Sequence, residues 1–298
     1  TLRKTILETA VEMGYTRRRR QKQTAKKLCI LVENLDYEEP HQFGYDIVTG
    51  FRQMAEPAGF LVEIFPITEK LQRSISYDMF MLQHDYLGAF ALGFTLQDPW
   101  MTDFQTSSTP TVLYDNYIKT NPRTAYVGVD NNEGMELAVS HLKELGHKKA
   151  LCLADNFICM DKERIEGFRK AFEPGEIYRW EIPKTEKERV CFYEDNYMQL
   201  LENSVTTVFA VSDFYALEFM RFLQGKNLRI PEDIQIIGFD DNMASRESNP
   251  SLTTIHQEAD LRAKAAIECL EAMRDGAEYK TEIVLPVDLI TRESTRKL

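Results

Sequence analysis

Short apolar segments alternate with helical segments along most of the chain, and this alternation restricts the fold more than any other feature of the sequence. The apolar segments, each bounded by turn residues, predict strands at 28–32, 61–65, 88–92, 111–114, 125–129, 150–154, 207–211, 234–238 and 281–285. Helical periods lie between them, for example at 44–58, 133–145, 164–172, 213–224 and 261–274. This order is typical of parallel sheets joined by right-handed crossovers, and so many strands exceed one sheet. We therefore expect two doubly wound α/β subdomains, with a small-molecule site in the cleft between them.

Composition narrows the class of protein further. The 298 residues suffice for two subdomains, no apolar run reaches the length of a membrane span, and no signal peptide opens the chain, so we expect a cytoplasmic protein. The five cysteines form no CxxC pair and the five histidines show no metal-ligand spacing, so we expect reduced thiols and no metal site. Phosphate loops of the GxGxxG and GxxxxGK[ST] types and a GxSxG elbow are missing, which argues against an enzyme and against a cofactor.

Charge is distributed unevenly along the chain. Residues 1–27 carry nine Lys and Arg against two Glu, a net charge of +7, which leaves −18 for the rest of a chain whose net charge is −11. The centre of this basic segment consists of Arg17, Arg18, Arg19, Arg20 and Lys22. Such a run is either a solvated, disordered segment or an arm that contacts the phosphates of a nucleic acid.

A short amphipathic helix is predicted just before the basic run. Apolar residues recur at steps of three and four between Leu2 and Met13, and Gly14 ends the pattern. A lone helix of this length is marginal in water, so it must pack on another element. Because no starting Met precedes it, we expect the chain to be a fragment of a longer protein.

Two adjacent carboxylates follow the apolar strand at 234–238. Asp240 and Asp241 stand at its carboxyl end, which is the edge where ligands bind in open α/β sheets. Successive strand residues point to opposite sides, so we expect only one of the pair to face the cleft. A buried Asp240 would need hydroxyls, amides or a cation as partners. The alternative is that both aspartates begin a loop and face water.

Taken together, these residues resemble the lactose/galactose-repressor (LacI/GalR) family of bacterial transcription regulators, along essentially the whole chain. VGVDNNEGMELAVSHLKELGHKKALCLAD is similar to the family's central strand–helix–strand segment, and RIEGFRKAF, VFAVSDFYALEFM and LPVDLITREST follow in the family's order. The resemblance implies a periplasmic-binding-protein-like core crossed three times by the chain, a homodimer, and a helix-turn-helix headpiece that binds operator DNA. It implies a partial headpiece at 1–15, a basic hinge at 16–27, one effector subdomain at 28–128 plus 258–285, and the other at 129–257 plus 286–298.

The resemblance also implies an effector site. Arg164 stands in the family's arginine-x-x-glycine-aromatic motif and matches the arginine that forks onto ligand hydroxyls. Asp240 and Asp115 match two aspartates of the family's cleft, while Ser212 and Asp213 stand where the family often has Asn-Asp. The alternative for Arg164 is an ion pair with a neighbouring acid across the cleft.

The chain departs from the family pattern at three places. Ser212 is shorter than asparagine and has one donor, which favours a water-mediated ligand contact. Glu33 ends the first strand, where the family usually has a small residue or proline; it either adds a carboxylate for an amino sugar or lies at the rim. The hinge holds arginines and lysines instead of the leucine that the family wedges into the minor groove, so we expect phosphate contacts and no wedge.

These observations predict the dimeric effector-binding core of a DNA-binding transcriptional repressor, which responds to a sugar or sugar-like ligand through a population shift between subdomain angles. The alternative is a solute-binding protein of a sugar transporter, which shares the core fold but would need an export signal and no basic segment. An enzyme on this scaffold would need an acid–base pair, and adjacent strand residues such as Asp240 and Asp241 diverge. The twelve residues after Pro286 contain no leucine heptad, so we expect no tetramer through a tail.

Overall fold

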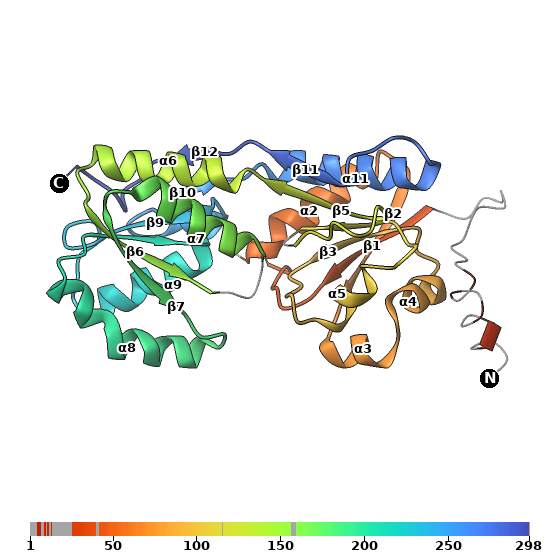
Figure 1. Ribbon diagram of the computed structural model, residues 1–298, viewed down its shortest axis with the longest axis horizontal. Helices are drawn as coiled ribbons and strands as arrows, with labels where there is room; N and C mark the ends of the chain where they lie inside the picture. The colour runs from red at the N-terminus through yellow and green to blue at the C-terminus, as the bar shows by residue number, and fades with distance from the viewer. Residues whose placement is uncertain are drawn as a thin grey trace. The chain divides into compact units, whose positions relative to one another are not determined.

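The chain forms two compact units. The computed structural model describes residues 5, 6, 9, 11, 13, 26–39, 42–114, 116–155 and 159–297. Unit 1 comprises the residues up to Gly128 together with Ala259–Leu285, and unit 2 comprises Val129–Glu258 together with Pro286–Leu298 (Figure 1). Glu258 thus lies in unit 2, whereas the sequence suggested the other subdomain. The helix expected at 1–15 and the basic hinge at 16–27 fall mostly outside the described residues.

Unit 1 is built on a six-stranded sheet in the order β11-β5-β4-β3-β1-β2. Its strands are β1 (Lys26–Val32), β2 (Phe60–Pro66), β3 (Ala89–Leu92), β4 (Thr111–Leu113), β5 (Thr124–Val129) and β11 (Glu282–Leu285). Helices α2 (Phe43–Ala55) and α11 (Ala259–Asp275) cover one face, where Phe51 stacks on Phe90 with 4.8 Å between ring centroids (Figure 1). The other face packs against α4 (Tyr77–His84) and α5 (Pro99–Asp103), around the fully buried Trp100. The short helix α3 (Glu69–Ser74) precedes them.

Unit 2 repeats the plan with a six-stranded sheet in the order β12-β10-β9-β8-β6-β7. Its strands are β6 (Lys149–Ala154), β7 (Glu176–Glu181), β8 (Thr207–Ala210), β9 (Gln235–Asp240), β10 (Thr253–His256) and β12 (Asp288–Ile290), the last antiparallel to β10. One face packs against α8 (Glu186–Glu202) and α9 (Asp213–Gly225). On the other face lie α6 (Asn131–Glu144) and α7 (Cys159–Phe172), whose Phe168 stacks on Phe209 at 4.8 Å. A short helix, α10 (Met243–Glu247), follows β9.

The predicted fold class is confirmed. Every predicted strand occurs within two residues of its expected limits, and both sheets are mostly parallel. Strands β7, β10 and β12 were not predicted. In each sheet the strand order reverses next to its first strand, β1 or β6, and ligands of open α/β sheets bind at the carboxyl ends of the strands there. Within the described part of the chain, no helix is long and apolar enough to cross a membrane.

Candidate ligand-binding site

Polar residues gather at the carboxyl ends of β6 and β8, where the strand order of unit 2 reverses. Asp155 follows β6 and accepts a hydrogen bond from the Tyr215 hydroxyl at 2.5 Å. Ser212 follows β8 and caps α9, because its hydroxyl oxygen accepts a hydrogen bond from the backbone N–H of Tyr215 at 3.5 Å. The predicted effector contact of Ser212 therefore starts from a side chain that already has a helix-capping role.

Arg164 is held in one orientation by three neighbours. Its Nε donates to Asn131 Oδ1 at 2.9 Å and its Nη1 donates to the carbonyl oxygen of Val211 at 2.6 Å. The guanidinium also lies over the Phe239 ring, 3.6 Å from its centroid, which is a favourable cation–π distance. The residue is 7% exposed, and no described residue is recorded as a hydrogen-bond partner of its Nη2. The head of Arg164 is thus fixed while one nitrogen keeps two donors for a ligand.

The adjacent aspartates point to different partners. Both have positive φ angles, 136° for Asp240 and 59° for Asp241, which turns the chain sharply after β9. Asp240 accepts from Gln257 Nε2 at 2.5 Å, and its Oδ1 lies 4.0 Å from Arg164 Nη1. Arg164 thus pairs with an acid of its own unit, whereas the alternative placed the acid across the cleft.

Asp241 belongs to a separate ionic cluster. Its carboxylate pairs with Arg292, with Arg246 at 3.1 Å and with His256 Nδ1 at 2.9 Å. Only 9% of Asp240 and 6% of Asp241 is exposed, so the alternative in which both face water is wrong. Asp241 is stabilised by its own cations, and Asp240 is the carboxylate that lies beside Arg164.

Asp213 does not occupy the position expected of an effector contact. Its side chain is completely buried, and its oxygens accept hydrogen bonds from Thr254 Oγ1 and Ser245 Oγ, both at 2.5 Å, and from the Asn242 N–H at 3.2 Å. Burial raises the pKa of this carboxyl to about 6 against the lowering effect of these hydrogen bonds. Because every contact is to β10, α10 or the turn before it, Asp213 joins elements within unit 2, and the prediction of an effector contact is corrected here.

The other predicted residues fall in unit 1 or outside the described residues. Glu33 follows β1, its N–H donates to Leu92 O at 3.0 Å, and only 5% of the residue is exposed, which does not fit a solvated rim. Asp115 lies outside the described residues, as do Arg17, Arg18, Arg19, Arg20 and Lys22. Among the described residues, no group of three or more His, Cys, Asp and Glu side chains could hold a metal ion.

Sequence reasoning missed the residues that orient Arg164 and Asp240. Asn131 begins α6 after β5, and its contact with Arg164 was not predicted. Phe239 precedes Asp240 in β9, and an aromatic residue in a buried strand is normally part of the core. Gln257 follows β10, a strand that the sequence did not predict. Their positions in the sequence could have identified them, because each of these residues lies at or near the carboxyl end of a parallel strand.

The comparison with known proteins fits this architecture. Residues 139–295 match the periplasmic binding protein-like domain family. The chain belongs to this family. The HTH-type transcriptional repressor PurR of Aliivibrio fischeri is 33% identical over 186 residues, which cover 58% of this chain and 54% of that protein. The chain thus spans about half the length of the curated relatives it matches. Together these matches confirm the resemblance to the LacI/GalR effector-binding core.

Solved structures share the fold over nearly the whole chain. One is a periplasmic binding protein/LacI transcriptional regulator from Alkaliphilus metalliredigens in complex with D-xylulofuranose, with a TM-score of 0.74, 23% identity, and coverage of 90% of this chain and 99% of that one. Another is a ribose operon repressor protein from Lactobacillus acidophilus, with a TM-score of 0.75, 21% identity, and coverage of 92% and 100%. At these identities the likeness concerns the fold.

Proposed function

We propose that this chain is the effector-binding core of a DNA-binding transcriptional repressor that responds to a sugar or sugar-like ligand. The fixed Arg164 head beside Asp240 is the observation that carries the proposal. The guanidinium Nη2 offers two donors, and the Asp240 carboxylate, whose Oδ1 lies 4.0 Å from Nη1, offers acceptors; neighbouring ligand hydroxyls require this pairing. The Phe239 ring against the guanidinium limits the movement of this donor.

The relatives favour a regulator over the solute-binding alternative. The curated relatives are named as transcriptional repressors, and the two structural neighbours are named for a sugar complex and for a ribose operon. Ligand binding would change the balance between conformations of the core, and thereby operator affinity, only through a difference in affinity for the two conformations. Within this proposal Arg164, Asp240 and Gln257 contact the effector, and contacts from Ser212, Glu33 and Asp115 stay predictions.

Operator DNA, a homodimer and a cytoplasmic location complete the proposal. DNA contacts are assigned to the basic residues 17–22, because a net charge of +7 over residues 1–27 suits a polyanion while the remaining −18 does not. A dimer would present two such arms to a two-fold symmetric operator.

A thermal-shift panel tests the effector class. The panel contains monosaccharides, disaccharides, amino sugars, sugar phosphates and purines, and a ligand at 100 times its Kd should stabilise the fold by about 2.7 kcal/mol. A shift confined to one sugar class would support the proposal. A shift from purines alone would overturn the sugar assignment and keep the fold.

Two matched arginine variants test the site itself. Arg164 and Arg292 each pair with one of the adjacent aspartates and each donate to a backbone carbonyl, that of Val211 or Leu252. Arg164→Gln should remove the ligand-induced shift in melting temperature. Arg292→Gln should lower the melting temperature of the ligand-free protein but preserve the ligand-induced shift. An unchanged ligand affinity in Arg164→Gln would reject this site.

A further inference from the structure

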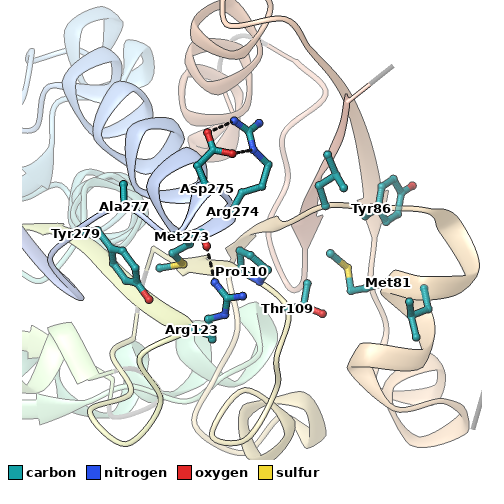
Figure 2. A pocket seen from close by; sticks show the side chains of 13 residues that line it. Met81, Tyr86, Thr109, Pro110, Arg123, Met273, Arg274, Asp275, Ala277 and Tyr279 are labelled. Carbon is teal, nitrogen blue, oxygen red and sulfur yellow. Dashed lines mark hydrogen bonds and ion pairs between the residues drawn. The ribbon is translucent and has the colours of Figure 1, made fainter. Parts of the chain in front are cut away.

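Unit 1 contains a cavity at the amino-terminal edge of its sheet. Glu33, which follows β1, stands at the opposite, carboxyl-terminal edge. Its volume is about 750 Å³, within the range of small-molecule sites in proteins. The loops that enter β3, β4 and β5 contribute to its lining, together with α4 and the end of α11 (Figure 2). Because these loops precede their strands, the cavity lies at the amino-terminal edge of the sheet, whereas Glu33 follows the carboxyl end of β1.

The walls of this cavity combine polar and apolar surface in similar measure. The apolar part of the lining includes Met81, Met273 and the rings of Tyr86 and Tyr279 (Figure 2). Both tyrosine hydroxyls are already engaged, since Tyr86 donates to Glu63 Oε2 and Tyr279 donates to the Pro122 carbonyl oxygen, each at 2.7 Å. What these residues offer to an occupant is therefore apolar surface, which suits an aromatic body.

The charged groups of the lining leave one positive charge without a carboxylate. Arg274 is neutralised by Asp275, with Nε–Oδ1 at 2.7 Å and Nη2–Oδ2 at 2.6 Å. Arg123 forms no ion pair with any described residue, and the hydrogen bond of its side chain to the described residues runs from Nη1 to the Met273 carbonyl oxygen at 2.5 Å. This bond anchors the guanidinium at the end of α11, as Figure 2 shows. The other N–H groups of Arg123 keep the forked geometry that matches a carboxylate.

We propose that this cavity is a second ligand site, which binds a small aromatic monocarboxylate. The carboxylate would pair with the Arg123 guanidinium, and the ring would lie among Met81, Met273 and Tyr279. The single unpaired cation favours a ligand with one negative charge, as a carboxylate carries, over a phosphate dianion. The site is independent of the proposed sugar effector, because it uses no residue of unit 2.

Calorimetric titration with phenylacetate and its neutral isostere phenylacetamide tests the proposal. The whole chain should bind phenylacetate at least about tenfold more tightly than phenylacetamide, a difference of about 1.4 kcal/mol. Arg123→Gln, which keeps a donor for the Met273 carbonyl, should weaken phenylacetate binding by about the same factor and remove the preference. Arg169→Gln, at an exposed position on α7, is the matched control and should bind as the wild type does.

Two further variants keep the test decisive. Ala277→Trp places a large side chain at an exposed loop position of the lining and keeps Arg123, and it should abolish phenylacetate binding even if Arg123→Gln fails to fold. Arg164→Gln should leave phenylacetate binding unchanged, which separates this site from the proposed effector site. No phenylacetate binding by the wild type at millimolar concentration, or equal binding by Arg123→Gln or Ala277→Trp, would overturn the proposal and leave Arg123 as a cap for α11 alone.

Discussion

Replacing Gly238 by alanine tests the packing beneath the candidate effector site. Gly238 lies in β9, two residues before Asp240, and a Cβ there would stand 2.1 Å from Asp213 Oδ1 and 2.9 Å from Leu252 Cδ2. The Asp213 carboxylate has no space to yield, because it is fully buried and held by three hydrogen bonds. The added methyl group therefore forces Oδ1 away from Thr254.

The expected loss of stability follows from these contacts. A hydrogen bond to a charged group contributes about 1.5–3 kcal/mol, and one excess methyl group in a packed core costs about 1–3 kcal/mol. Replacing a strand glycine by alanine also lowers the entropy of the unfolded chain, which offsets about 0.5–1 kcal/mol. We expect Gly238→Ala to reduce the free energy of unfolding of unit 2 by about 2–5 kcal/mol.

Urea unfolding followed by tryptophan fluorescence measures this change in unit 2 alone. The chain has two tryptophans, Trp100 in unit 1 and Trp180 in unit 2, so a Trp100→Phe background leaves only the second signal. Gly225→Ala, where a Cβ would meet nothing within 4 Å, is the control and should change stability by less than about 1 kcal/mol. A loss below about 1 kcal/mol for Gly238→Ala would refute the argument that Asp213 is rigidly held.

Further predictions concern pH, the paired aspartates and DNA. The pKa of Asp213 is raised from 3.8 to about 6, so the folded state holds this proton more tightly than the unfolded state. The raised pKa contributes roughly 3 kcal/mol to the free energy of unfolding. This contribution is fully present below about pH 4 and is lost as the pH rises through 6. Urea titrations at several pH values should show this loss in the wild type and not in Asp213→Asn. Asp240→Asn should weaken effector binding in the thermal-shift assay with little change in melting temperature. Asp241→Asn should lower the melting temperature with little change in effector binding, because it breaks a buried ionic cluster at a cost of about 3–5 kcal/mol. The chain should bind DNA weakly and without sequence preference in fluorescence anisotropy, and the binding should vanish by about 200 mM salt; sequence-specific, salt-resistant binding would contradict the assignment to residues 17–22.

The strands that the sequence revealed are those stabilised by apolar burial. β1, β6, β8 and β9 read as continuous apolar runs because both of their faces are covered. β7 has the sequence EIYRWE at the edge of its sheet, where exposed charged residues interrupt the pattern. β10 begins with Thr253 and Thr254, which are fully buried. Their hydroxyl groups tolerate burial because they form hydrogen bonds with Thr295 and Asp213. Polar residues buried in this way are indistinguishable from a loop when only hydropathy is read.

The candidate site was predictable to the same degree. Arg164 and Asp240 stand in recognisable motifs, and the divergence of Asp240 from Asp241 follows from their adjacency after a strand. Asp213 could not be placed, because its burial depends on Ser245 and Thr254, which are more than 30 residues away in the sequence. The partners of Arg164 pose the same difficulty, since Asn131 begins α6 and Val211 follows β8, far apart in the sequence. Pairings of this kind are fixed by tertiary structure.

The interleaved course of the chain has a consequence for its synthesis. The core of unit 1 joins Phe51 and Phe90, made early, to Ile267, Leu270 and Met273 of α11, which the ribosome reaches only after the whole stretch 129–258 of unit 2. At about 5–20 residues per second, the face of the first sheet that α11 covers waits roughly 10 to 30 seconds for its last helix. Unit 1, most of which is synthesised first, is thus completed by α11, which is synthesised near the end. Until α11 emerges, the apolar face of the unit 1 sheet is available to chaperones.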